Sequence, residues 1–66
     1  MNLTVNGDPR QLLAAQTVRD LIVDMGLANA VVAVELNKQL VPRKAHESTP
    51  LTEGDTLEIV TLVGGG

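Results

Sequence analysis

Residues 56–66 read TLEIVTLVGGG, an apolar run typical of a β-strand that is followed directly by three glycines. Without Cβ atoms a glycine backbone is thin and tolerates extended or positive-φ conformations. Taken alone, such a run fits either a flexible linker or a thread that enters the narrow active site of a partner. In the second case the tail is a substrate, and its reactive group is the carboxylate of Gly66.

The last strand, expected at 56–63, also suggests a surface. If Leu57 and Ile59 face a helix, the alternate residues face away from it. The outward set is Glu58, Val60 and Leu62, with Val31 and Ala33 expected beside it. An exposed apolar patch next to the tail is typical of a protein interface, whereas a bulge or a covered second face removes it. The docking candidates are Val60, Leu62, Val63 and Arg43, although a solvated charge is the favoured interpretation of Arg43.

A short helix is predicted to begin after Thr17. Thr17 is a good N-cap, and Asp20 three residues later completes a weak capping box. Apolar residues recur with helical spacing at Val18, Leu21, Ile22 and Met25. Gly26 resembles the glycine that ends a helix, with Leu27 as its closing apolar contact. A helix this short is marginal alone, so it must pack its stripe on a sheet.

Two hairpins flank the helix in sequence. The first joins residues 2–6 to a return strand expected at 10–13, through the turn residues Asn6 and Gly7 and with Pro9 at the start of the return strand. The second joins 31–36 to 39–41 through Asn37 and Lys38. Residues 43–50 are polar, with room for one helical turn, and 52–55 form a further turn. The order β-β-α-β-β-β predicts an α+β fold, a mixed sheet with one helix packed across one face.

Composition excludes several function classes. The 66 residues make one small domain, expected at 1–63, with a flexible glycine tail at 64–66. A net charge of −3 and the absence of aromatic residues argue against nucleic-acid binding. Neither a signal peptide nor a membrane span is recognisable, so we expect a cytoplasmic protein. With no Cys, one His and scattered acids, we expect no metal site and no bound cofactor.

No catalytic set is recognisable either. His46 lies among polar neighbours, and a solvated loop residue is favoured over a catalytic base. Asp20 and Asp24 are one helical turn apart, which is more often a solvated helix face than acid–base chemistry. Gly7, Gly26 and Gly54 are far apart and fit turns or a cap, so no phosphate loop is expected. The protein is therefore not expected to be an enzyme.

The element order with a terminal glycine run resembles the ubiquitin-like β-grasp fold, and most closely the ThiS family of thiamine-biosynthesis sulfur carrier proteins. The residues that carry the resemblance are 32–37 (VAVELN), 41–43 (VPR), 51–55 (LTEGD), 57–60 (LEIV) and 63–66 (VGGG). Each piece is weak alone, but their order and their distances to the terminus are specific together.

The resemblance implies a protein cosubstrate. A partner adenylyltransferase, related to ubiquitin-activating enzymes, uses ATP to convert the Gly66 carboxylate into an acyl-adenylate. A sulfur donor protein then generates a thiocarboxylate, which delivers sulfur to thiazole synthase, while Gly64 and Gly65 thread into the partners' active sites. Because the chain has no thiol, it cannot carry sulfur as a cysteine persulfide, and the terminal acyl carbon is the plausible carrier atom.

Other functions remain open at this point. The small subunit of molybdopterin synthase has the same fold and chemistry, but such chains tend to be longer and to end in two glycines. A ubiquitin-like modifier conjugated to lysines is less favoured. From a different class, the chain fits a non-catalytic β-grasp interaction module with an inert tail.

Overall fold

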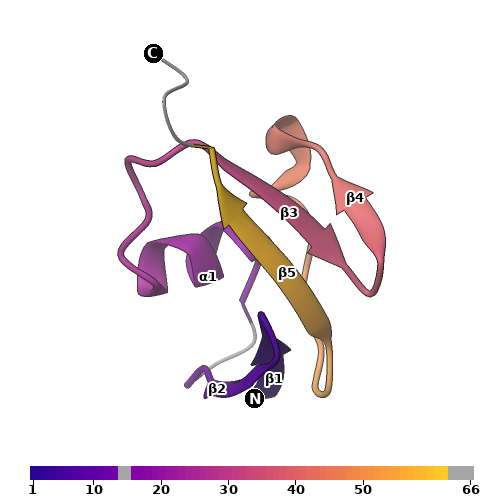
Figure 1. Ribbon diagram of the computed structural model, residues 1–66. Coiled ribbons are helices and arrows are strands. Elements are labelled where there is room, and N and C mark those ends of the chain that lie inside the picture. The colour runs from indigo at the N-terminus through magenta and orange to yellow at the C-terminus, as the bar shows by residue number, and fades with distance from the viewer. Residues whose placement is uncertain (14–15, 63–66) are drawn as a thin grey trace.

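A computed structural model describes residues 1–13 and 16–62 of the chain (Figure 1). The predicted order β-β-α-β-β-β is confirmed, and the helical turn for which residues 43–50 had room is a 3₁₀ turn. The elements are β1 (Asn2–Val5), β2 (Asp8–Gln11), α1 (Val18–Asp24), β3 (Val32–Leu36), β4 (Gln39–Val41), η1 (Arg43–Ala45) and β5 (Thr56–Thr61). Among the described residues, no helix is long and apolar enough to cross a membrane.

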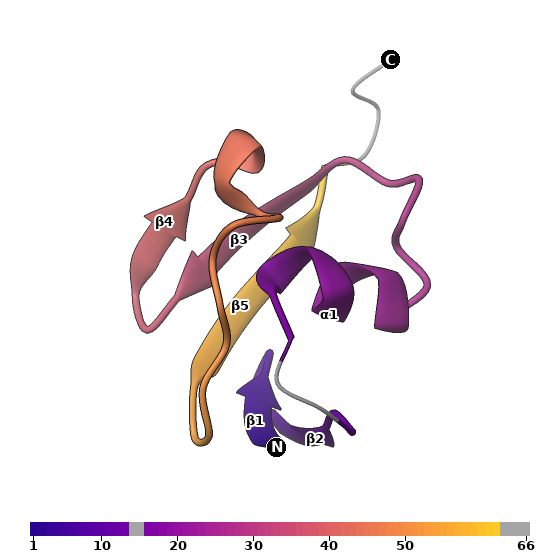
Figure 2. The ribbon, with the colours of Figure 1, turned by 180° about the vertical axis from the view of Figure 1, so that it is seen from behind.

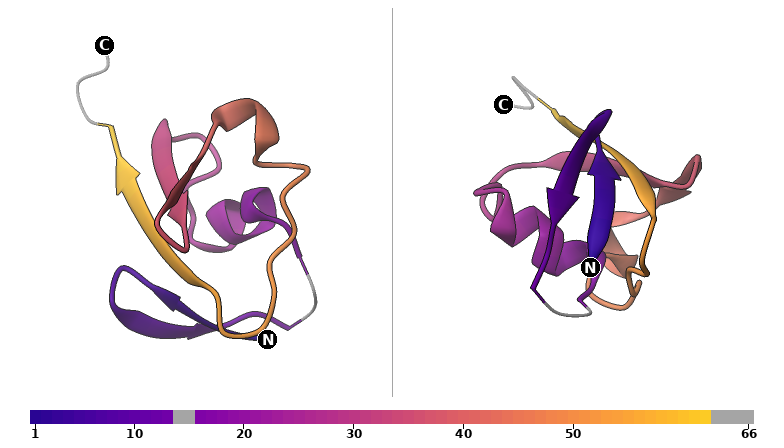
Figure 3. Two further views of the ribbon diagram at one scale, coloured as in Figure 1. Left: turned by 90° about the vertical axis from the view of Figure 1, so that its right-hand side faces the viewer. Right: turned by 90° about the horizontal axis from the view of Figure 1, so that it is seen from below.

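The five strands form one mixed sheet in the order β2-β1-β5-β3-β4. β5 is the central strand, parallel to β1 and antiparallel to β3. α1 packs across one face of this sheet (Figures 2 and 3). The predicted sheet with a single helix across it is therefore confirmed, and the last strand of the chain lies at its middle.

Both hairpins close through two-residue turns with positive φ at each turn residue. The φ values are 52° and 84° at Asn6 and Gly7, and 50° and 70° at Asn37 and Lys38. This left-handed geometry matches the twist of the paired strands. The first return strand was predicted at 10–13, which is wrong at both ends. Since the turn already closes at Gly7, pairing resumes at Asp8 opposite Val5, and Pro9 lies within the edge strand.

The ends of α1 follow the sequence closely. The Thr17 hydroxyl oxygen accepts the Asp20 N–H at 3.3 Å, and the Asp20 carboxylate accepts the Thr17 N–H at 3.1 Å. Gly26 has φ +77°, and the Leu27 N–H donates to Ile22 O at 3.0 Å. The capping box and the glycine end are therefore both confirmed.

The core lies between α1 and the sheet. The predicted helix stripe is buried at Val18, Leu21 and Ile22, and Met25 packs partly against it. Leu57 and Ile59 of β5 are buried beneath the helix, as their alternation predicted. Each such side chain contributes roughly 1.5–3 kcal/mol of hydrophobic free energy. Packing, rather than helix propensity, therefore holds the seven-residue α1 in place.

Candidate functional site

The predicted reactive residues follow directly from the end of β5. Gly64, Gly65 and Gly66, together with Val63, lie outside the described residues, so the structure places none of them. What it shows is how firmly the preceding chain is held. β5 pairs with β3 from Leu57 to Thr61, and the Leu62 N–H donates to Val31 O at 2.8 Å. The chain is therefore bonded to the sheet as far as Leu62.

The asparagines of the two hairpin turns hold β5 from the side. The Asn6 side chain bonds both backbone groups of Ile59, accepting its N–H at 2.7 Å and donating to its carbonyl at 3.0 Å. This extends the short β1–β5 pairing beyond Val5. The Asn37 side chain accepts the Thr56 N–H at 3.0 Å. The sequence predicted turns at these asparagines but not their hydrogen bonds to the backbone of β5. The available signal was that short amide side chains often bond to nearby backbone groups.

The outward face of β5 carries the predicted apolar patch. Val60 and Leu62 are 57% and 51% exposed, and Val31 is 50% exposed. Ala33 is half-buried and pairs directly with Val60. We call these four residues, Val31, Ala33, Val60 and Leu62, the outer patch. Farther along the same strands, Glu35 and Glu58 stand opposite each other and give the outward face an acidic end.

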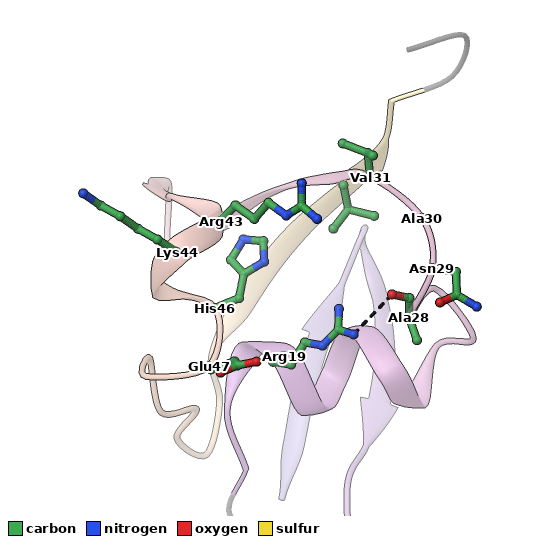
Figure 4. A pocket seen from close by; sticks show the side chains of 10 residues that line it. Arg19, Ala28, Asn29, Ala30, Val31, Arg43, Lys44, His46 and Glu47 are labelled. Carbon is green, nitrogen blue, oxygen red and sulfur yellow. Dashed lines mark hydrogen bonds between the residues drawn. The ribbon is translucent and has the colours of Figure 1, made fainter. Parts of the chain in front are cut away.

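A groove, separate from the outer patch, lies between α1, residues 28–31 and η1 (Figure 4). Pro42 ends β4, and the chain turns immediately through η1, where Arg43 and Lys44 are exposed. Arg43, predicted as a docking candidate, lines this groove rather than the outer patch. Val31 lines the groove too, so it connects the two surfaces.

The prediction of a solvated His46 is wrong. His46 is only 5% exposed, and its Nε2 lies 3.1 Å from Val41 O. Because a carbonyl oxygen only accepts, Nε2 is the donor in this bond. The physical reason for the burial is that the segment after η1 folds back over the start of α1, where Thr49 O and His46 O accept the N–H groups of Val18 and Arg19, each at 2.9 Å (Figure 3). His46 thus has a structural position.

The carboxylates singled out in the sequence have structural partners. Asp20 belongs to the capping box, whereas Asp24 is not simply solvated as predicted. It forms an ion pair with Arg10 at 2.9 Å, which ties β2 to the end of α1.

Residues 1–13 and 16–62 contain no group of three or more His, Asp or Glu that could hold a metal ion. Gly7, Gly26 and Gly54 have positive φ, in agreement with the predicted turns and cap.

The chain is similar to known proteins over its whole length. The ThiS family model matches residues 3–66. The sulfur carrier protein ThiS of Thermus thermophilus is 36% identical over 62 residues, which cover 94% of this chain and 95% of that protein. A thiazole synthase of Paramagnetospirillum magneticum is 39% identical over 66 residues, all of this chain but 20% of that protein. The chain thus spans about a fifth of the length of the curated relatives it matches first.

A solved structure has the same fold. The crystal structure of the thiamine biosynthesis protein ThiS from Geobacter metallireducens superposes with a TM-score of 0.83, at 38% identity and over 100% of both chains. The superposition spans both chains from end to end. The chain therefore belongs to the ThiS family of thiamine-biosynthesis sulfur carriers, and it has the ubiquitin-like β-grasp fold.

Proposed function

We propose that this protein carries sulfur on the carboxyl group of Gly66 and supplies it for thiazole formation in thiamine biosynthesis. The observation that carries the proposal is the family match, which extends through the three glycines to residue 66. The protein is then a cosubstrate on which other enzymes act. The body presents the chain end, and Gly64 and Gly65 give those enzymes access to it.

The chemistry begins with an unreactive carboxylate. In the proposed cycle an oxygen of the Gly66 carboxylate attacks the α-phosphate of ATP in a partner adenylyltransferase, and pyrophosphate leaves. Sulfide-level sulfur, released by a sulfur donor protein, then attacks the acyl carbon. The C–O bond to AMP breaks, AMP leaves, and a thiocarboxylate remains on Gly66. The absence of cysteine supports this carrier atom, since the chain has no thiol that could hold a persulfide.

Thiazole synthase is the proposed acceptor of the sulfur. Two relatives named thiazole synthase, from Paramagnetospirillum magneticum and Magnetococcus marinus, contain a segment similar to this entire chain. A carrier-like segment within a protein of that name supports the thiamine branch over the molybdopterin branch, because it joins the two components in one polypeptide.

The outer patch is the proposed docking surface for these partners. Half-exposed Val60 and Leu62 lie directly before the chain end, and their burial against a partner removes apolar surface from water. Val63 continues this run in the sequence. Docking the body beside the strand end brings the following residues to the partner's active site.

The intact mass of the protein tests the proposal. The protein is incubated with ATP, a sulfur source and the adenylyltransferase, and we expect a gain equal to the mass difference between sulfur and oxygen, localised to Gly66 by fragmentation. Without ATP the mass stays unchanged. An unchanged mass with ATP, when the same enzyme activates another carrier, contradicts the proposal. Offering the charged protein to thiazole synthase and to the large molybdopterin synthase subunit then identifies the acceptor.

A further inference from the structure

The groove between α1, residues 28–31 and η1 has a volume of about 760 Å³ and is open to solvent. This lies within the range of roughly 300–1,000 Å³ that is typical of ligand sites. Ala28, Ala30, Val31 and Val32 contribute its apolar wall, and Arg19 and Arg43 contribute cationic side chains. Lys44 borders the groove on η1, with its side chain directed outward (Figure 4). The groove adjoins the end of β5, because Val31 O accepts the N–H of Leu62 at 2.8 Å.

The charge of the groove is opposite to that of the molecule. Although the chain has a net charge of −3, three of its five Lys and Arg residues line the groove, against one of its eight Asp and Glu residues, Glu47. Within the described residues, the only ion pair involves Arg10, so these three cations are not neutralised by carboxylates there. A cleft lined by one sign of charge concentrates its potential.

The cations are spread along the groove rather than gathered at one point. Arg19 is held at the α1 side, where its guanidinium donates to Ala28 O at 3.2 Å. Figure 4 shows Arg43 reaching over the groove from η1, while the Lys44 side chain extends away from it. A compact anion is best held by converging donors, whereas separated cations beside an apolar wall match an extended segment with several carboxylates.

The turn η1, which carries Arg43 and Lys44, is held by hydrogen bonds of His46. The His46 ring bonds Val41 O, the last residue of β4, and the His46 N–H donates to Arg43 O at 3.1 Å. These two bonds close η1 against the core. The backbone of Arg43 is therefore placed relative to α1 by the fold before a partner binds, so that only the Arg43 side chain has to be ordered on binding.

We propose that this groove binds an acidic, partly apolar peptide segment of the adenylyltransferase. The inference rests on the proposed function for the identity of the partner. The groove lies beside the strand end, so an enzyme that takes up the chain beyond Leu62 also has its surface next to Arg43. The outer patch and the groove then contact one partner on the two sides of Val31, the patch through apolar burial and the groove through charge.

Charge reversal at matched positions tests the groove. Arg43→Glu and Lys38→Glu change the net charge equally, but Lys38 lies in the β3–β4 turn, at the opposite end of β3 from Val31 (Figure 1). Adenylation is measured through the release of pyrophosphate. We expect Arg43→Glu to raise the KM of the adenylyltransferase for the carrier about tenfold with kcat unchanged, and Lys38→Glu to change this KM less than about twofold. Arg43→Lys keeps the positive charge, so its KM should stay close to that of the unaltered protein. The KM of the unaltered protein should rise with salt more steeply than that of Arg43→Glu. Equal KM values for the two reversals overturn the proposal.

A second measurement works without the enzyme. A soluble peptide of alternating Glu and Leu residues is titrated into ¹⁵N-labelled protein, with the Gln–Leu peptide and inorganic phosphate as controls. We expect amide shifts at 28–31 and 43–47 with the acidic peptide alone. Absence of these shifts, or equal shifts with either control, overturns the proposed occupant. If adenylation of the unaltered protein fails while these shifts appear, the proposed function is contradicted and the groove's binding chemistry stands.

Discussion

Asp55 shows how one exposed turn stabilises the start of β5. Its carboxylate accepts the Thr52 N–H at 2.8 Å, the Thr52 hydroxyl at 3.1 Å and the Asn37 side-chain N–H at 3.0 Å. Partial burial alone would raise the pKa of Asp55, but the bonds from Asn37 and Thr52 outweigh it and hold the pKa below its ordinary value. The ionised form is thus favoured by folding.

Replacing Asp55 by Asn should make stability less dependent on pH. Because the folded pKa is lowered, the carboxylate stabilises the protein above the pKa of the unfolded chain, and this contribution is lost as pH falls through the folded value. At pH 7 we expect the Asp55→Asn variant to have a free energy of unfolding about 1 kcal/mol lower. Urea unfolding followed by far-UV circular dichroism measures it, since the chain has no Trp or Tyr.

The difference in the free energy of unfolding between the unaltered protein and Asp55→Asn should then shrink at acidic pH. Asp8→Asn, in the exposed edge strand β2, removes the same charge and serves as the control. A difference between wild type and Asp55→Asn that stays constant from pH 7 to acidic pH would show that the charge of Asp55 contributes nothing.

His46 marks the limit of prediction for a single residue. Its sequence neighbours Lys44 and Glu47 are polar, and a local pattern of this kind is typical of a solvated loop. Its burial depends on Val41 O and on the start of α1, both of which meet it only in the folded chain. Contacts of this kind have no local sequence signal.

At the scale of elements, the first turn of α1 depends on Thr17. Substitution by Ala leaves the Asp20 N–H without the hydroxyl oxygen that accepts it, and we expect the free energy of unfolding to fall by about 1 kcal/mol. Thr17→Ser keeps the oxygen and should lose much less. Urea unfolding compares the three proteins. Equal stabilities of the Ala and Ser variants would mean that other groups cap the helix sufficiently.

Elements with a local chemical signature were the ones that the sequence predicted well. The Asn6–Gly7 turn, the Thr17 cap and the Gly26 helix end each depend on residues within a few positions of one another, and all three are confirmed. The β2 range was misplaced because its alternation is weak and Pro9 suggested a later start. Only the pairing of Asp8 with Val5 sets that boundary.

At the scale of the whole molecule, the sheet was predictable and the groove was not. Alternation in β5 and the stripe of α1 specify which faces meet, so the α+β arrangement and the outer patch follow from periodicity. The groove joins Arg19 of α1 to Arg43 and Lys44 of η1, about 25 residues away in sequence, and to the segment before β3. Such a cluster of charges arises from topology, and it is invisible in a pattern of neighbours. The roles of Gly64, Gly65 and Gly66 remain predictions.

Extending the chain beyond Gly66 separates the carrier from a plain interaction module. With one Ala added after Gly66, the acyl group to be activated no longer belongs to that glycine, and the added side chain must enter a passage proposed to fit glycine alone. We expect adenylation to be lost, as measured by pyrophosphate release. The buried core lies within residues 3–59, so stability should stay within about 0.5 kcal/mol of the unaltered protein.

A removable extension supplies the control for this loss. When a specific protease cleaves a longer extension after Gly66, adenylation should return to the level of the unaltered protein, because the same body then presents the original carboxylate. Full activity of the uncleaved chain would contradict a role for the Gly66 carboxyl group. Loss of activity together with lower stability would instead show that the extension acts through the fold. Activation lost at unchanged stability, and regained on cleavage, assigns the chemistry to the chain end and the docking to the body.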